Sequence, residues 1–403
     1  MDYNLTKDEF VAVAQSAKYD IIPVYCELLA DFETPVSAYI KLTNGNCLKQ
    51  EDTTPGFLLE SIEGGIHHAR YSFLGVNPKT AIVQADVDPL PAIEQRMQDR
   101  KIMPNPKLPD FLGGAMGYFA YDCVRFFEPS VKMSEKNIVG VPDSVFMFFD
   151  NLVVFDNLKH SMFVTSLIHL PKSDNAAPSQ SPYDLATLEP LYSAAITQIQ
   201  RTVTSLCAPL PESMLVPSTI SAHAHTATYR ENDVHADVEN TCHHEIGAEA
   251  AYLREQDVPR PNTSSTTIAG VTYNQGLDGY KHMVHSLKED ICAGNIIQAV
   301  PSHRLSKKIK DTGVCAFDVY RQLRVINPSP YMYYVNVPGK TKVCIPPRVD
   351  SPRATISQTA RQADVSKSYF ITLLYHLSSH RMRTRTPPLT AMSITVTPQV
   401  QLR

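Results

Sequence analysis

The sequence contains no tryptophan and has little glycine. Its 403 residues include 16 glycines, whereas average usage of about 7% would give about 28. The chain also lacks an apolar run of the roughly 18–20 residues that cross a bilayer. Its first ten residues, MDYNLTKDEF, have no basic-then-apolar signal pattern. We therefore expect a soluble, cytoplasmic protein without a membrane partner.

Cysteine pairs and a large excess of one charge are also lacking. The eight cysteines are scattered singly, without a C-x-x-C pair, which argues against a disulfide framework or a zinc ribbon and favours reduced thiols. The net charge is −4 and 19% of the residues are charged, so the chain has no general basic surface. We expect no nucleic-acid partner.

Residues 1–206 have the pattern of an α+β domain. Thr6 and Glu9 form a capping-box pattern that predicts a helix near the start of the chain. Apolar and polar residues alternate from Val36 to Leu42, which we interpret as a half-buried strand. Further strands are predicted at 57–61, 70–75, 112–122, 145–149 and 152–156.

The order of these elements favours an antiparallel sheet, because several strands follow one another with few helices between them. Asp150 and Asn151 are good turn residues and predict a tight turn between the last two strands. A closing helix is predicted by apolar residues at helical spacing, namely Leu188, Leu191, Tyr192, Ala195 and Ile199.

Residues 207–270 interrupt this pattern. They are rich in Pro, Ser, Thr, His and Asn and show no sustained period. Histidines gather here beside a cysteine and a glutamate, which leaves a metal site as one reading: His223, His225, His235, His243, His244, Cys242 and Glu245. The flanks lack the order that holds metal ligands in place, so we favour a disordered linker or insertion and assign no metal ligand.

Residues 271–343 have regular periodicity again. A helix is predicted from the apolar face Tyr280, Met283, Val284, Leu287 and Ile291, ending at Gly294. A strand is predicted at 296–305, with Gln298 on its polar face. That face suits either a wet cavity or a solvent-facing edge, and Pro301 supports the edge. A second helix at 316–324, with Ala316, Val319, Tyr320 and Leu323 inward, and a strand at 331–337 follow.

The tail, residues 344–403, differs in composition from the rest of the chain. After Gly339 there is no glycine and no glutamate, and basic and hydroxyl residues are frequent. We expect an aberrant, disordered tail, produced by a change of reading frame or a gene-model error after Val343.

Several blocks of the sequence resemble the anthranilate synthase component I family. In the first half they are 23–28 (PVYCEL), 34–39 (TPVSAY), 57–61 (FLLES), 70–75 (RYSFLG), 113–122 (GGAMGYFAYD) and 141–143 (VPD). In the second half they are 293–304 (AGNIIQAVPSHR) and 327–332 (NPSPYM). The resemblance implies an antiparallel-sheet chorismate-utilising fold, with a complete N-terminal domain at 1–206 and the start of a chorismate-binding domain at 271–343.

The family's function follows from this resemblance. Component I enzymes bind chorismate and Mg²⁺, and ammonia supplied from glutamine by the amidotransferase component II attacks the ring, which yields anthranilate and pyruvate. Gln298 occupies a position where related isochorismate-forming enzymes carry a lysine. A glutamine has no titratable group, which favours an amine nucleophile over water. Aminodeoxychorismate synthase component I remains an alternative.

The resemblance also implies a regulatory tryptophan site. Its expected residues are Glu60, Ser61, Asn327, Pro330, Tyr331 and Met332. Polar groups suit the ammonium and carboxylate of an amino acid, and aromatic and Met surfaces suit an indole. The structural alternative is that 57–61 is a core strand and that 327–332 is a turn into another strand.

The family's Mg²⁺-binding carboxylates and its Pro-Ile-Ala-Gly-Thr chorismate loop have no counterpart after Val343. We therefore expect this chain to be inactive by itself. Three interpretations stay open: an incompletely represented enzyme, a catalytically dead fragment that binds tryptophan or component II, and an unstable product.

Overall fold

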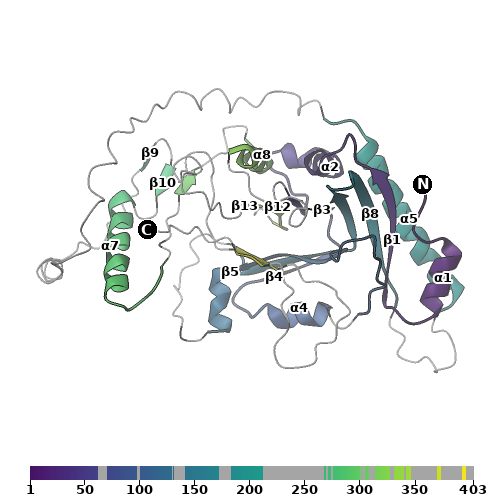
Figure 1. The fold of residues 1–403 in the computed structure, drawn as a ribbon, viewed down its shortest axis with the longest axis horizontal. Coiled ribbons are helices and arrows are strands. Elements are labelled where there is room, and N and C mark those ends of the chain that lie inside the picture. Colours follow the sequence, from purple (N-terminus) through teal and green to yellow (C-terminus); the bar gives the residue numbers. More distant parts are fainter. Residues whose placement is uncertain are drawn as a thin grey trace, which may run out of the picture.

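The computed structural model describes residues 1–61, 70–97, 100–128, 130, 141–171, 183–211, 267–268, 271–273, 276–299, 301, 305–307, 314–326, 331–339, 342–345, 370–373 and 393–395. Two antiparallel sheets dominate (Figure 1). The first has the order β1 (Ile21–Leu29), β8 (Ser161–His169), β7 (Asn151–Asp156), β3 (Tyr71–Val76), β2 (Gly56–Ser61), β12 (Tyr331–Asn336) and β13 (Lys342–Ile345).

The second sheet has the order β15 (Ser393–Thr395), β14 (Phe370–Leu373), β5 (Gly114–Ala120), β6 (Ser144–Phe149) and β4 (Thr80–Gln84). A small third sheet joins β11 (Leu305–Lys307), β10 (Val271–Tyr273) and β9 (Thr267–Ile268). The helices are α1 (Lys7–Gln15), α2 (Pro35–Leu42), α4 (Leu90–Met97), α5 (Leu185–Cys207), α7 (Gly276–Cys292) and α8 (Ala316–Ile326), with short 3₁₀ turns at Asn46–Leu48 and Tyr121–Phe126. The predicted α+β class with antiparallel sheets is confirmed.

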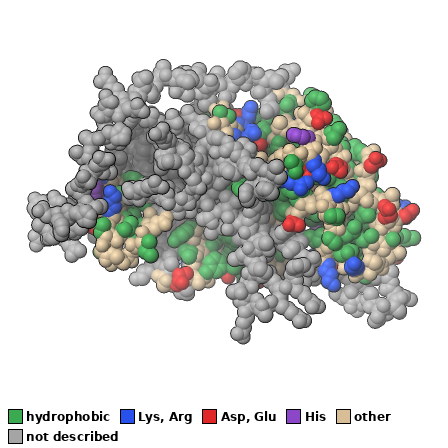
Figure 2. All heavy atoms as spheres, in the orientation of Figure 1, with side chains coloured by type: hydrophobic (Ala, Val, Ile, Leu, Met, Phe, Trp, Pro, Cys, Tyr) green, Lys and Arg blue, Asp and Glu red, His purple; other side chains and the backbone are tan. Residues whose placement is uncertain are grey.

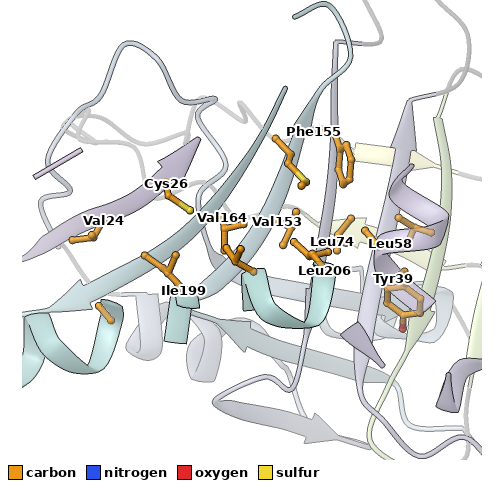
Figure 3. Close-up of a cluster of buried hydrophobic side chains, with 14 of the residues drawn as sticks. Val24, Cys26, Tyr39, Leu58, Leu74, Val153, Phe155, Val164, Ile199 and Leu206 are labelled. Carbon is orange, nitrogen blue, oxygen red and sulfur yellow. The ribbon is translucent and has the colours of Figure 1, made fainter. Parts of the chain in front are cut away.

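Both faces of the seven-stranded sheet are buried, as alternate residues along its strands show. On β2, Leu58 packs under the helices α1, α2, α5 and α8, whereas Phe57 packs against the second sheet. Figure 3 shows Tyr39 of α2 and Ile199 and Leu206 of α5 among the strand residues of the helix-facing core. A third cluster, which includes Ile93 of α4, covers the far face of the second sheet. The fold is therefore layered as helices, sheet, sheet and helix.

Several predicted elements are confirmed. Thr6 caps α1, and Thr6 and Glu9 form the expected capping box. The predicted closing helix is α5. The predicted strand at 112–122 is shorter, because β5 ends at Ala120 and a 3₁₀ turn follows. The helix α7 ends as expected at Gly294, whose φ of 79° accompanies bonds from its own N–H to Ile291 and from Asn295 to Asp290.

Three predictions from local sequence patterns are wrong. The segment from Val36 to Leu42 is the helix α2, begun by Thr34, whose Oγ accepts a hydrogen bond from Ser37 N, with Pro35 in the first turn. Asp150 does not turn a hairpin, because β6 lies in the second sheet and β7 in the first. The chain therefore changes sheets at this point.

The predicted strand at 296–305 is also wrong over its described part. Residues 296–299 are not in a strand, and a strand is assigned only at Leu305–Lys307. The strands at 305–307 and 331–336 lie in different sheets. β11 belongs to the small sheet, whereas β12 lies between β2 and β13 in the largest one.

Much of the predicted linker and of the predicted tail lies outside the described residues. The five histidines of the linker are among the residues that are not described. Beyond Val343 the described residues are the end of β13 and the strands β14 and β15. The disordered tail and the proposed domain boundaries stay predictions. On the face in Figure 2, Lys and Arg side chains are interspersed with Asp and Glu over the coloured residues.

Candidate functional site

The described residues of the two segments expected to form a regulatory site lie on neighbouring strands, 57–61 on β2 and 331–332 on β12. β12 pairs with β2 in antiparallel register, which places Met332 opposite Glu60 and Tyr331 opposite Ser61. Residues directly opposite each other in an antiparallel pair point to the same face, and successive residues point to opposite faces. Glu60 and Met332 therefore face the helix layer, whereas Ser61 and Tyr331 face the other way.

Glu60 is a buried carboxylate held by the helix α8. Glu60 is only 4% exposed. The Tyr320 hydroxyl donates a short hydrogen bond to Oε2, and Arg324 Nε lies 2.9 Å from the same oxygen. The Nε–H of Arg324 is not aligned for a hydrogen bond, so this contact is an ion pair. Tyr320 and Arg324 are one helical turn apart and share one face of α8.

The charge state of Glu60 reflects two opposing effects. Burial raises the pKa of the Glu60 carboxyl above its ordinary value, because the charged form loses solvation. Arg324 and the hydrogen bond from Tyr320 act in the opposite direction and favour the ionised form. The protonation state of Glu60 therefore depends on the charge of Arg324 and on the hydrogen bond from Tyr320.

Ser61 lies where the ladder between β2 and β3 ends. The last paired residues there are Leu59 and Phe73. Beyond them side-chain hydroxyls replace backbone partners: Ser61 Oγ donates to the Tyr71 carbonyl at 2.7 Å, and Ser61 N donates to Ser72 Oγ at 3.1 Å. The strands separate at this end while β2 remains paired with β12.

Two further polar residues lie at this end of the sheet. Asn157 Nδ2 is 3.3 Å from Ser72 Oγ and 3.4 Å from the Ser61 carbonyl. Asp156 is buried and receives Arg70 Nη2 at 2.7 Å and Nε at 3.1 Å.

The Asp156 carboxyl is held ionised at neutral pH. Burial alone would raise its pKa, but hydrogen bonds from Arg70 and from the Lys159 backbone outweigh that effect, and the pKa lies below its ordinary value. The guanidinium of Arg70 lies 4.7 Å above the Tyr71 ring. The end of the sheet thus combines hydroxyl, amide and charged groups.

The remaining predicted residues are not brought into this arrangement. Asn327 and Pro330 lie outside the described residues. Gln298 is exposed in an irregular stretch after α7, so its predicted role in lining a pocket stays a prediction. Sequence reasoning placed Tyr320 inward without a role and missed Arg324. A tyrosine and an arginine four residues apart, just before 327–332, were the available signal.

No metal centre is found among the described residues, where no three His, Cys, Asp or Glu side chains are grouped suitably for an ion. The described part of the chain also contains no helix with the length and apolarity to span a bilayer.

Comparison with known proteins places these observations in a family. Residues 54–349 match the model of the chorismate binding enzymes, a span that includes both β2 and β12. The chain belongs to the chorismate-binding enzyme family. The match covers more than half of the chain and ends six residues after Val343.

Two relatives illustrate the similarity within this family. The chain is 31% identical to "Probable anthranilate synthase component 1" of Schizosaccharomyces pombe over 80% of this chain and 52% of that protein. It is 30% identical to "Anthranilate synthase component 1" of Saccharomyces cerevisiae over 79% and 51%. A crystal structure of component I from Streptococcus pneumoniae TIGR4 aligns with a TM-score of 0.37 at 20% identity, over 76% of this chain and 54% of that one. The chain thus spans about half the length of the curated relatives it matches.

Proposed function

We propose that this chain carries the tryptophan-sensing part of an anthranilate synthase component 1. The whole protein would convert chorismate and ammonia into anthranilate, pyruvate and water, and tryptophan would inhibit it. The names of the relatives and the sequence blocks support this function. The observation that carries it is the register of β2 and β12, which aligns Glu60 with Met332 and Ser61 with Tyr331.

The chemistry at this end of the sheet suits an amino-acid effector. A carboxylate such as Glu60 can accept hydrogen bonds from an ammonium group, and hydroxyl or amide groups such as those of Ser61 and Asn157 can donate to a carboxylate. Met332 and Tyr331 supply the apolar and aromatic surface that an indole needs. A few polar groups beside apolar surface are typical of small-molecule sites.

The catalytic half of the proposal rests on the family. Chorismate is the expected substrate, and component II is the expected source of ammonia. Gln298 has no titratable group, which fits an amine nucleophile better than activated water. The described residues do not fit a Mg²⁺ site, so no step of the reaction is derived through the ion.

Binding of L-tryptophan tests the effector site directly. Because the chain has no tryptophan, the indole fluorescence of the ligand reports its binding without a background from the protein. We expect a saturable rise in fluorescence anisotropy, which weakens in Ser61→Arg because the longer side chain occupies the end of β2. Ser16→Arg, at an exposed helix end, is the matched control and should bind normally. A cooperatively folded chain that leaves the anisotropy unchanged would refute the site.

Enzymatic activity requires a second experiment. A chimera would join residues 1–345 to the remaining C-terminal part of the S. pombe relative. With chorismate, Mg²⁺ and ammonium, we expect it to form fluorescent anthranilate and to be inhibited by L-tryptophan. A chimera that folds but forms no anthranilate would contradict the proposed catalytic function.

A further inference from the structure

The helix α8 connects the two halves of the effector site. It ends at Ile326, immediately before the segment 327–332, and its inner face contacts the buried Glu60 of β2. Its packing fixes it in place, because Phe317 stacks on Tyr39 of α2 with ring centroids 5.3 Å apart and meets Tyr334 of β12 at 5.1 Å. The side chains of α8 that face Glu60 can therefore be substituted without removing the contacts of Phe317.

The two oxygens of the Glu60 carboxylate have different surroundings. Oε2 receives the Tyr320 hydroxyl and lies 2.9 Å from Arg324 Nε. No described residue donates a hydrogen bond to Oε1, and this atom is not among the fully enclosed ones that lack a partner. One oxygen is thus engaged by α8, and the other retains its capacity to accept.

The groups around Glu60 are few. From α8, Tyr320 and Arg324 face it; from β12, the directly opposite residue is the uncharged Met332. On the β3 side, the position level with Glu60 in the continued register is Ser72, which is also uncharged. Of the described charged groups, Arg324 is the one that acts appreciably on Glu60.

We propose that Tyr320 and Arg324 are positioning residues of the effector site: they hold Oε2 of Glu60 so that Oε1 accepts the ammonium group of the bound amino acid. The inference rests on the proposed tryptophan site and deepens it, because it assigns to α8 the control of effector affinity. Neither residue needs to touch the effector.

A pH dependence follows from this arrangement. Burial raises the pKa of Glu60, whereas Arg324 and Tyr320 oppose that rise. Removing either one raises the pKa further, so the neutral form is populated at a higher pH. A neutral carboxyl cannot form an ion pair with an ammonium group. As the pH is lowered, effector binding should therefore be lost at a higher pH in the variants than in the parent chain.

The test measures L-tryptophan binding by ligand anisotropy from neutral pH downward, through the range in which carboxyl groups titrate. We expect Arg324→Gln to bind about tenfold more weakly at neutral pH, the effect of losing one charged contact that orients a ligand group. Tyr320→Phe, which keeps the ring, should bind several-fold more weakly. In both, the midpoint of the pH profile should move upward, and Arg324→Lys should restore part of the loss.

Two controls separate positioning from a general loss of structure. Arg321→Gln changes an arginine on the same helix whose partner is Asp318 at 3.3 Å, and it should leave binding unchanged. Indole-3-propionate lacks the ammonium group, so its affinity should be equal in the parent chain and in Tyr320→Phe. Thermal melts of each variant show whether the fold is intact.

The outcomes distinguish this inference from the function beneath it. If the folded parent chain does not bind L-tryptophan, the proposed site is wrong and the inference fails with it. If the parent binds but Tyr320→Phe and Arg324→Gln bind equally well with the same pH profile, only the inference is overturned. Tighter binding by Arg324→Gln would also overturn it, because Arg324 would then compete with the effector for Glu60.

Discussion

Replacing Asn336 with alanine tests whether β12 is held on β2 in the register on which the proposed effector site depends. Asn336 is buried at the end of β12, opposite Gly56. Its Nδ2 donates to Asp52 Oδ2 at 2.8 Å and to the Thr54 carbonyl at 2.7 Å. These bonds tie the end of β12 to the loop that precedes β2.

The size of the effect follows from these contacts. The variant loses one charge-assisted hydrogen bond, worth about 1.5–3 kcal/mol, and one neutral bond, worth about 1 kcal/mol. Asp52 is buried, but Thr54 N still donates to it at 2.9 Å, so its carboxylate keeps part of its hydrogen bonding. Asn336 Oδ1 accepts no hydrogen bond from the described residues, so its removal costs nothing. We expect the free energy of unfolding to fall by about 2–4 kcal/mol.

Urea unfolding followed by circular dichroism measures this change. The control is Asn46→Ala, which removes the same side chain from a half-buried site. There Nδ2 donates to Thr54 Oγ1 at 3.4 Å and Oδ1 accepts an exposed bond from Lys49 Nζ at 2.7 Å, so the loss should be about 0.5 kcal/mol. L-Tryptophan binding should weaken with Asn336→Ala, because a slip of one residue would turn Met332 to the opposite face. If Asn336→Ala lowered the free energy of unfolding no more than the control does, the bonds of Asn336 would not be what holds β12 in its register on β2.

Three further predictions concern the fold around the site. Gly117→Ala should destabilise by about 3 kcal/mol or more in urea unfolding, because its Cβ would lie 1.8 Å from the Val145 carbonyl oxygen on the paired strand β6. Asp156→Asn should flatten the acid limb of the stability curve: the parent's advantage from Asp156 is present above about pH 4 and is lost as pH falls through the lowered native pKa. Thr34→Ala should cost about 1 kcal/mol by removing the cap of α2.

Each of these has its own check. Val83→Ala, at a 51% exposed position of β4, should be nearly neutral where Gly117→Ala is severe. An unchanged slope of stability against pH between about pH 5 and pH 3 would contradict the role given to Asp156. For α2, Thr34→Asn should retain most of the stability that alanine loses, and equal losses would argue against a side-chain cap.

Short sequence motifs correctly predicted those helix ends that are determined by a few adjacent residues. The capping box of α1 and the glycine that ends α7 are written in a few adjacent residues, and both appear as expected. The seven residues from Val36 to Leu42 fit both the two-residue period of a strand and the 3.6-residue period of a helix, so their alternation of apolar and polar residues predicted a strand. The sequence Thr34-Pro35-x-Ser37 was the better guide, because a side-chain cap and a proline at N1 suit only a helix.

Long-range pairing could not be read from local patterns. The turn residues at Asp150 suit a hairpin and a change of sheet equally well, and which occurs depends on partners elsewhere: β6 pairs with β4 and β5, and β7 with β3 and β8. The adjacency of β2 and β12 likewise came from the family resemblance. Arg324 was missed because an arginine near the end of a helix ordinarily faces solvent.

The geometry suggests a reason why the motif of the proposed effector site occupies the end of β2 and not its middle. Glu60 and Ser61 are successive residues, so within a continuous sheet their side chains would be separated by the sheet itself. At this end, however, the ladder to β3 stops after Leu59, and Ser61 turns its hydroxyl to the Tyr71 carbonyl. A ligand at the strand end can therefore reach the helix-facing carboxylate and the hydroxyl beyond it together.

That position also gives the buried charge a purpose. An ion pair such as Glu60 with Arg324 costs desolvation, and well-packed apolar residues in its place often stabilise a protein as much or more. The neighbouring positions of the same face, Leu58 and Met332, are apolar and fully packed. A carboxylate kept among them, with one oxygen engaged by α8 and one available, is better explained by a cationic group that binds there than by stability.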